Sequence, residues 1–423
     1  MEPERGARTR GARRRSARCG ADYLRERRRE PGGVTWGTGA HGWKAARRIL
    51  CVRLDGMGDV LMTTPAMRAL RESGEGRHLT LLTSRSGRAV APYIREVDDV
   101  IEFAAPWMKP PGCAAAGDVA LIESLKLRRY DAAVIFTVYS QSPLPAAYVC
   151  YLAGIPLRLA HCRENPYHLL TGWIREPEPH EKLRHEVRRH LDLVARVGCR
   201  TADERLSFTV PDAARERADA LLAAVNVQAP LIVVHPGASA PSRRYPGERF
   251  AQALDLLLAR REATVLFTGA PDEVALVEAI RAAMNAPSRS LAGRLTLGEL
   301  GAVLERAALL VSNNTGPVHI AAALGTPVVD LYALTNPQHT PWQVAAEVLY
   351  AEVPCRFCYR SVCPLGHHEC LTRVAPEEIA AAAERLLGSA GAERHDRPDG
   401  AVIGAFGRLS AVTYAASATD RSE

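Results

Sequence analysis

Short apolar runs alternate with amphipathic stretches along the first half of the chain. The runs lie at 49–52, 79–83, 100–103 and 132–138, and residues with a helical period separate them. An apolar run of this length is typical of a strand that is buried on both faces. Strands and helices that alternate in this order predict a parallel sheet covered by helices on both sides.

The same pattern starts again after a long helix expected at 181–197. The expected strands of this second series are 231–235, 264–268, 309–312 and 328–332, and the expected helices are 247–260, 271–284, 297–306 and 316–324. The sequence therefore predicts an α/β protein of two facing Rossmann-like, doubly wound domains. Because ligands of such folds bind at the carboxyl ends of the strands, the two sheets should share one cleft.

Four segments follow from this pattern. Residues 1–46 are expected to be a disordered basic tail, 47–205 an N-terminal domain, 206–388 a C-terminal domain, and 389–423 a second disordered tail. Residues 1–48 hold 14 of the 54 Lys and Arg residues but 5 of the 47 Asp and Glu residues, so the net charge of +7 belongs to the tail. Such a tail is a solvated extension or an arm for nucleic acid or a membrane surface, and we expect the former.

The composition bounds the location of the protein. No apolar stretch approaches the roughly 20 residues that a membrane-spanning helix needs, and the basic tail lacks the apolar core of a secretion signal. Ten cysteines in 423 residues are too few for a disulfide scaffold. We expect a cytoplasmic protein, with peripheral contact at the inner face of the plasma membrane as an open alternative.

A glycine turn follows the first expected strand. Gly56 and Gly58 let the backbone turn sharply, and Asp59 then falls in the first turn of a helix. Asp59 either caps this helix or stands at the cleft as a general base. Leu61 occupies the place of the third glycine of a dinucleotide fingerprint, which disfavours a dehydrogenase. Pro65 predicts a kink or the true first turn of the helix.

Two further turns have features of anion sites. Arg243 and Arg244 lie in a loop that follows an expected strand, where an arginine fork suits phosphate oxygens. Asn314, Thr315 and Gly316 connect another strand to a helix whose N-terminus favours an anion, although either polar side chain could be an ordinary cap. Two such turns in one domain predict a pyrophosphate ligand.

Four cysteines fall within sixteen residues near the end of the second domain. Their spacing matches no standard zinc ribbon or finger, so a structural zinc ion, redox-labile thiols and plain reduced thiols all stay open. The cysteines are Cys355, Cys358, Cys363 and Cys370.

Basic residues crowd the start of the long helix expected at 181–197. We interpret them as a solvated face, with an acidic acceptor as the functional alternative. The residues are Lys182, Arg184, His185, Arg188, Arg189 and His190.

These motifs together resemble glycosyltransferase family 9, the ADP-heptose:lipopolysaccharide heptosyltransferases, over about 48–387. No single motif is specific, but the combination is. The matching segments are RLDGMGDVLMTTPAMRAL at 53–70, HPGA at 235–238, RRYPGERF at 243–250, TGAPDE at 268–273, LAGRLTLGEL at 291–300 and NNTGPVHIAAALGTPVVDLY at 313–332.

The resemblance implies a glycosyltransferase B-type fold, with the acceptor in the N-terminal domain and the nucleotide sugar in the C-terminal domain. Asp59 matches the family's catalytic aspartate. The implied nucleotide-sugar residues are Arg243, Glu273, Asn314, Thr315, Gly316 and His319. Two of these depart from the family pattern, because Arg243 replaces a lysine and Asn314 stands where aspartate is common.

The function implied is inverting transfer of a sugar, heptose from ADP-heptose, to an acidic lipid-linked or glycan acceptor such as the lipopolysaccharide core. No acidic pair suited to a divalent ion adjoins the turns, so we expect no cofactor and no catalytic metal. Nucleic acid is not an expected partner. The alternatives are another nucleotide sugar on the same fold, or a non-catalytic protein that binds zinc or nucleic acid.

Overall fold

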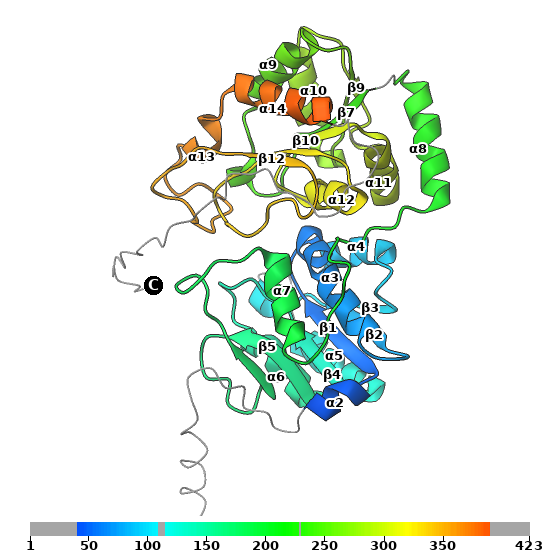
Figure 1. Ribbon diagram of the computed structural model, residues 1–423, viewed down its shortest axis with the longest axis vertical. Helices are drawn as coiled ribbons and strands as arrows, with labels where there is room; N and C mark the ends of the chain where they lie inside the picture. The colour runs from blue at the N-terminus through cyan, green and yellow to red at the C-terminus, as the bar shows by residue number, and fades with distance from the viewer. Residues whose placement is uncertain (1–39, 109–114, 228–229, 390–423) are drawn as a thin grey trace, which may run out of the picture.

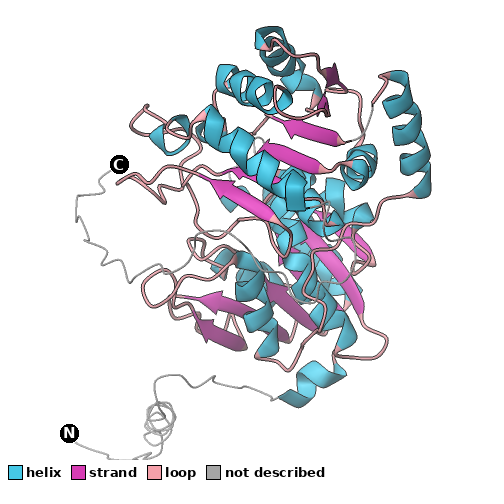
Figure 2. Cartoon of the chain, turned by 45° about the horizontal axis from the view of Figure 1, so that its top comes forward, coloured by secondary structure: helices cyan, strands magenta, loops and turns pink. Residues whose placement is uncertain are grey.

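The computed structural model describes residues 40–108, 115–227 and 230–389. It contains two six-stranded sheets, one above the other in Figure 1, and every strand pair in both is parallel. Helices lie on both sides of the strands (Figure 2). The predicted class, an α/β protein of two facing doubly wound units, is confirmed.

The first sheet has the order β3-β2-β1-β4-β5-β6. Its strands are β1 (Arg48–Arg53), β2 (His78–Thr83), β3 (Asp99–Glu102), β4 (Ala132–Ile135), β5 (Leu157–Cys162) and β6 (Gly172–Arg175). The helices of this half are α2 (Ala40–Ala45), α3 (Met57–Glu72), α4 (Arg85–Val90), α5 (Ala115–Arg128), α6 (Leu144–Leu152) and α7 (Glu186–Ala195), with short 3-10 turns η1 (Ala91–Tyr93) and η2 (Pro106–Met108).

The second sheet has the order β12-β11-β10-β7-β8-β9. Its strands are β7 (Leu231–His235), β8 (Thr264–Phe267), β9 (Arg289–Ser290), β10 (Leu309–Asn313), β11 (Val328–Leu331) and β12 (Ala346–Leu349). The helices are α8 (Asp212–Ala224), α9 (Gly247–Leu258), α10 (Val274–Ala283), α11 (Leu297–Arg306), α12 (Gly316–Leu324), α13 (Glu369–Thr372) and α14 (Pro376–Ser389), with η3 (Pro241–Arg243) and η4 (Pro271–Glu273).

The fold begins earlier than the predicted boundary at residue 47. Helix α2 precedes that boundary, and Trp43 within it is 2% exposed in the main hydrophobic core. The carbonyl of Trp43 accepts a hydrogen bond of 2.6 Å from Arg77 Nη2. The remainder of the predicted basic tail, 1–39, and most of the predicted C-terminal tail, 390–423, lie outside the described residues.

Pro65 does not mark the start of a helix, because α3 runs through it from Met57 to Glu72. A proline has no N–H for the carbonyl four residues earlier, which here is that of Leu61. The Thr64 hydroxyl donates to this carbonyl at 2.7 Å instead. The side chain before the proline thus replaces the missing backbone donor.

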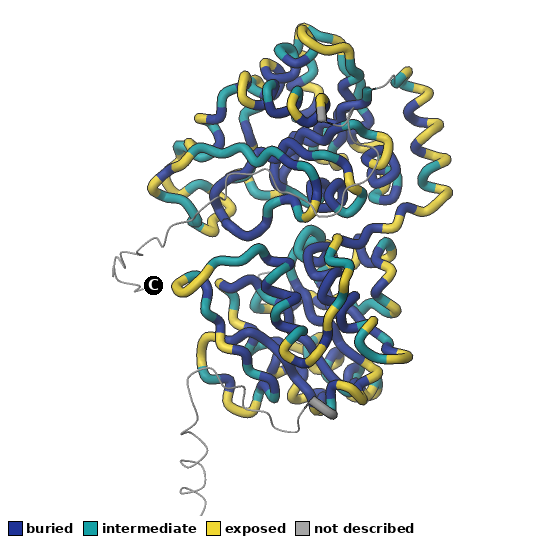
Figure 3. Tube along the Cα trace, viewed as in Figure 1, coloured by how far each residue is buried: buried dark blue, intermediate teal, exposed yellow. Residues whose placement is uncertain are grey.

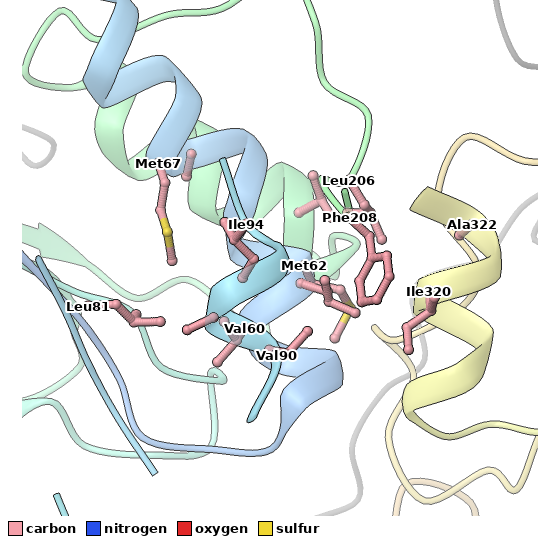
Figure 4. Close-up of a cluster of buried hydrophobic side chains, with 14 of the residues drawn as sticks. Val60, Met62, Met67, Leu81, Val90, Ile94, Leu206, Phe208, Ile320 and Ala322 are labelled. Atoms are coloured by element: carbon pink, nitrogen blue, oxygen red, sulfur yellow. The ribbon is translucent and has the colours of Figure 1, made fainter. Parts of the chain in front are cut away.

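The two halves share a hydrophobic interface. Helix α12 of the second half packs against α3 of the first, and the buried cluster there joins Met62 to Ile320 and to Phe208 of the connecting segment (Figure 4). Buried residues continue from one half to the other through this contact (Figure 3). The carboxyl ends of both sheets are therefore held at a common edge.

Candidate functional site

A cavity of about 420 Å³ lies between the two halves, at the carboxyl ends of β1, β7, β8 and β10. Every predicted site residue other than the cysteines lines it. These residues are Gly56, Gly58, Asp59, Arg243, Glu273, Asn314, Thr315, Gly316 and His319. Residues that are 263 positions apart in sequence thus meet in one cleft.

Asp59 caps its helix and also lines the cavity. Its Oδ2 accepts a hydrogen bond of 3.0 Å from the Gly56 N–H, which caps α3. Its Oδ1 lies 3.1 Å from Arg53 Nη2, and the side chain is 20% exposed at the cavity wall. Burial would raise the pKa of this carboxyl, but the Arg53 guanidinium and the nearby His339 hold it below the usual value. The carboxylate is therefore ionised and fixed in direction.

Arg53 is the buried centre of charge on which this arrangement depends. It is 0% exposed at the end of β1, and it forms ion pairs with Asp55 at 3.1 Å, Asp59 at 3.1 Å and Glu186 at 3.0 Å. Burying an arginine without such partners would cost several kcal/mol. Sequence reasoning did not assign Arg53, although it ends an apolar strand directly before the glycine turn.

The basic stretch at the start of the long helix is only partly a solvated face: Lys182 is exposed and the Arg188 side chain is 42% exposed, but other members are buried. Arg189 and His190 are 1% and 0% exposed. Arg189 pairs with Glu176, and His190 Nε2 lies 3.0 Å from Glu186 Oε1. The helix itself is shorter than expected, because α7 begins at Glu186 with His185 as its N-cap. Arg189 and His190 belong to an internal network of ion pairs that supports Arg53.

The glycines of the first turn allow a close approach between the halves. A Cβ on Gly58 would lie 2.6 Å from Cδ2 of His319, and a Cβ on Gly316 would lie 2.7 Å from Sδ of Met57. Carbon atoms do not approach this closely, so larger residues would separate α3 from α12. His319 itself is 3% exposed, and burial lowers its pKa to about 3.

The second half supplies groups suited to an anion. Among the described residues no hydrogen bond or ion pair occupies the guanidinium of Arg243, which lines the cavity. Arg244 instead donates to the Ala238 carbonyl at 2.7 Å, and it does not line the cavity. No side chain caps α12, because the Thr315 hydroxyl donates to the Asn313 carbonyl at 3.2 Å. Among the described residues the N–H of Gly316 has no hydrogen-bond partner and stays available to a ligand, whereas Pro317 has no N–H and Val318 donates to the Thr315 carbonyl at 3.1 Å.

Glu273 occupies the far wall of the cavity. Its Oε2 accepts from the Ala270 N–H at 2.8 Å and lies 3.7 Å from His235 Nε2. A Cβ on Gly237 would lie 2.0 Å from Oε1 of Glu273, so any larger residue here would displace the Glu273 carboxylate. The HPGA segment is thus shaped around the Glu273 carboxylate.

Asn314 presents its side-chain oxygen to the cavity. Its Nδ2 donates to Asp330 Oδ2 at 2.9 Å and to the His339 carbonyl at 2.9 Å, which uses both amide hydrogens. Asp330 is 0% exposed, and burial raises its pKa to about 8. At neutral pH Asp330 is mostly protonated, so no charge lies behind Asn314.

The cysteine segment lies apart from this cavity. A small separate pocket is lined by Cys355, Cys358, Cys363, Cys370 and His367. Cys355 Sγ lies 3.7 Å from His367 Nε2. In the described part of the chain, no three His, Cys, Asp or Glu side chains are arranged to hold a metal ion.

Sequence reasoning missed three of the groups around Asp59. Arg53 ends an apolar strand and Glu186 lies within the basic stretch, so the sequence did not mark either of them as a site residue. His339 lies 3.8 Å from Asp59 Oδ1, and it comes from a loop without any periodic pattern. No signal in the sequence could have identified His339, because its position next to Asp59 arises only when the chain folds.

Solved structures share this two-sheet fold. A glycosyltransferase of family 9 from Veillonella parvula covers 81% of this chain and 98% of its own, at a TM-score of 0.67 and 23% identity. The ADP-heptose LPS heptosyltransferase II of Escherichia coli covers 82% of this chain and 100% of its own, at a TM-score of 0.63 and 22% identity. The fold is thus the one found in these glycosyltransferases, the B type.

Sequence comparison gives the family. The model of glycosyltransferase family 9 (heptosyltransferase) matches residues 119–369. Lipopolysaccharide heptosyltransferase 2 of Escherichia coli K12 is 25% identical over 353 residues, which are 80% of this chain and 98% of that protein. The chain belongs to glycosyltransferase family 9 and is a glycosyltransferase.

Proposed function

We propose that the protein transfers heptose from ADP-heptose to a lipid-linked or glycan acceptor of the lipopolysaccharide core, with inversion at the anomeric carbon. The observation that carries this proposal is the cavity in which Asp59 of the first half faces Arg243 and the Thr315–Gly316 turn of the second. The names of relatives support the donor and the acceptor, since they include an ADP-heptose LPS heptosyltransferase and lipopolysaccharide heptosyltransferases.

The division of labour follows the two halves. We place the donor in 206–388, where Arg243 and the N-terminus of α12 offer positive charge and N–H groups to a diphosphate. We place the acceptor in 47–205, where a second cavity of about 400 Å³ adjoins Asp55 and is lined by Trp107 and Gln141. An indole face beside polar groups suits a sugar ring.

The reaction we infer uses Asp59 as the general base. Its carboxylate takes the proton of the acceptor hydroxyl while that oxygen attacks the anomeric carbon from the face opposite the nucleotide. Negative charge then builds on the departing diphosphate. Arg243 and the Thr315–Gly316 turn stabilise this charge, and the interaction strengthens as the bond breaks.

The charge of the first half supports an acidic acceptor near a membrane surface. A shallow cavity of about 600 Å³ beside β6 and α7 is lined by five cationic residues, and Asp192 is the one acidic residue among its walls. The cationic residues are Arg175, Lys182, Arg184, Arg196 and Arg200. Phosphate groups of a lipid-linked acceptor suit this surface.

We also propose a cytoplasmic location at the inner face of the plasma membrane. The eight cysteines of the described residues are free thiols, which fits a reducing compartment. No helix in the described ranges combines the length and the apolar character that crossing a membrane requires.

Asp59→Asn tests the base directly. The variant keeps the size of the side chain but removes its basicity, so turnover of ADP-heptose should fall by about 10²–10⁴-fold. Calorimetric affinity for ADP should stay within about twofold, and Asp118→Asn on α5, away from the cavity, is the matched control. Wild-type turnover in Asp59→Asn would remove Asp59 from the mechanism. The anomeric configuration of the product, read by NMR, tests inversion separately.

A further inference from the structure

One loop of the second half crosses to the first. The segment 336–342 lies between β11 and β12, yet Gln338 within it is 0% exposed and lies against α7. Gln338 Nε2 donates to Glu178 Oε2 at 2.9 Å and to the Arg184 carbonyl at 2.8 Å, and its own carbonyl accepts from the Glu186 N–H at 3.1 Å. We call this segment the strap.

The strap is anchored again at its far end. His185 Nε2 lies 2.9 Å from the Thr340 carbonyl, and Trp342 Nε1 donates to the Glu204 carbonyl at 2.8 Å. The guanidinium of Arg188 lies 5.9 Å above the centre of the Trp342 ring. These contacts on both sides fix the residue between them, which is His339.

The strap places His339 against Asp59. Nδ1 of His339 lies 3.8 Å from Asp59 Oδ1, and the ring lines the cavity with its side chain 10% exposed. The backbone is also tied down, because its N–H donates to Tyr332 Oη at 3.2 Å and its carbonyl accepts from Asn314 at 2.9 Å. A histidine of the donor half thus completes the surroundings of the carboxylate in the acceptor half.

The hydrogen bonds of Asn336 assign the proton on the ring. Asn336 Oδ1 accepts from the Gln338 N–H at 2.8 Å, so its Nδ2 faces His339 Nε2 at 3.3 Å. An amide nitrogen only donates, hence Nε2 of His339 accepts. In the neutral ring the proton is then on Nδ1, the nitrogen that lies 3.8 Å from Asp59 Oδ1.

We propose that His339 is a positioning residue for Asp59, whose Nδ1–H holds Oδ1 so that a free lone pair of the carboxylate faces the acceptor hydroxyl. This inference rests on the proposed role of Asp59 as the base. Hydrogen bonds of this kind tighten when the reactants bind, so 3.8 Å is compatible with the role. The site is complete only while the strap is docked on α7.

The charge around the ring favours its neutral form. Burial lowers the pKa of His339, while Asp59 and Glu186 raise it and Arg53 and Arg243 lower it. The other titratable rings near it, His185 on α7 and His319 on α12, are neutral as well, because burial lowers their pKa values to about 4 and about 3. A neutral ring can orient Asp59 without the full positive charge that would weaken the base. Activity should therefore fall in acid as His339 takes up a second proton.

His339→Ala and His339→Asn test the role together. Alanine removes the donor, so kcat should fall by about 10- to 100-fold, while ADP affinity and the melting temperature change little. Asparagine places an N–H where Nδ1 stands and does not titrate, so it should recover most of kcat at neutral pH and remove the acid limb that His339 contributes. His168→Ala, at an exposed histidine outside the cavity, is the matched control.

Each other outcome overturns the inference. Wild-type kcat in His339→Ala, or an equal loss of kcat and ADP affinity that asparagine does not recover, would show that His339 does not act through Asp59. The double variant Asp59→Asn/His339→Ala should be no slower than Asp59→Asn alone. If Asp59→Asn is inactive and His339→Ala is fully active, only the positioning role fails. If Asp59→Asn itself is active, the proposed base fails.

Discussion

At the scale of single residues, the site depends on which polar groups are already occupied. Two neighbouring arginines illustrate this point. The guanidinium of Arg244 donates to the Ala238 carbonyl, whereas the guanidinium of Arg243 has no hydrogen bond or ion pair with any described residue. Asp59 and Asn314 are likewise held by partners on one side, and each presents the remaining lone pairs to the cavity. Whether a polar group already has a hydrogen-bond or ion-pair partner, and not its residue type, separates groups that face the cavity from structural ones.

The two arginines form a matched pair for mutation. Arg243→Ala should weaken ADP binding and reduce turnover further, because the transition state carries more negative charge than the ground state. Arg243→Lys should recover much of the activity, since the charge is kept. Arg244→Ala should leave both nearly unchanged. Calorimetry with ADP and initial rates would check this, and a larger effect at Arg244 would place the diphosphate elsewhere.

Asp330→Asn should change how stability depends on pH. The pKa of about 8 in the folded protein lies above the ordinary value of 3.8, so between these values the folded chain holds a proton that the unfolded chain releases. This contribution to stability falls by up to about 1.4 kcal/mol per pH unit as pH rises through that window. The variant has no such proton. Urea unfolding at pH 6.5 and pH 8 should therefore show a smaller loss in Asp330→Asn than in the wild type, and equal losses would contradict the burial argument.

At the scale of elements, the contact between α3 and α12 brings the two halves of the site together. Each helix begins at the cavity and each has a glycine where the other approaches, Gly58 on α3 and Gly316 on α12. The helices can therefore lie close enough for Asp59 to face the anion-binding turn. The strap, which docks on α7 through hydrogen bonds, makes a second contact between the two halves.

Gly58→Ala tests the α3–α12 contact. The added Cβ would meet the His319 ring at 2.6 Å, so the helices must separate and turnover should fall by about 10-fold or more. Gly117→Ala on α5 is the control, because a Cβ there meets nothing within 4 Å. The control should be neutral or stabilise by about 0.4–1 kcal/mol. Initial rates and melting temperatures distinguish the two, and full activity of Gly58→Ala would show that the contact is not needed.

At the scale of the whole molecule, buried ionisable groups accumulate where the halves meet. His190 and His319 are buried and His185 is partly buried, and all three are neutral, with pKa values lowered to about 4 for His185, about 4 for His190 and about 3 for His319. The negative charges of the acidic residues beside these histidines are balanced by the positive charges of nearby arginines. We therefore expect the stability of the protein to depend on pH through groups that lie where the two halves meet.

Acid should destabilise the protein at these histidines. An unfolded histidine takes up a proton near pH 6.5, whereas the folded rings do so only near pH 4 or below, so stability is present above pH 6.5 and falls as pH decreases. Each ring contributes up to about 1.4 kcal/mol per pH unit between these limits. Urea unfolding at pH 7 and pH 5 would measure the fall. His185→Gln should remove the share of one ring, and a stability that does not change with pH would refute the assignment.

How much the sequence predicted can be judged from particular elements. The apolar runs at 49–52 and 231–235 became β1 and β7 because a buried parallel strand must be apolar on both faces. Short edge strands such as β6 and β12 have no such run, so the apolar pattern did not predict them. The glycine turn and the two turns predicted to bind an anion all line the cavity, because the residue pattern that marks such turns is local.

The sequence by itself thus determined the α/β class, eight of the twelve described strands and the turns that carry Asp59, Arg243 and Gly316. Only the tertiary structure decided which charged residues are buried and which face a ligand. Arg189 and Arg243 look alike in sequence, but one is held inside an ion network and the other lines the cavity. His339 was beyond any local pattern, because its position against Asp59 arises from a loop that docks across 280 residues of chain. Burial and long-range pairing are properties of the folded chain, and local periodicity does not encode them.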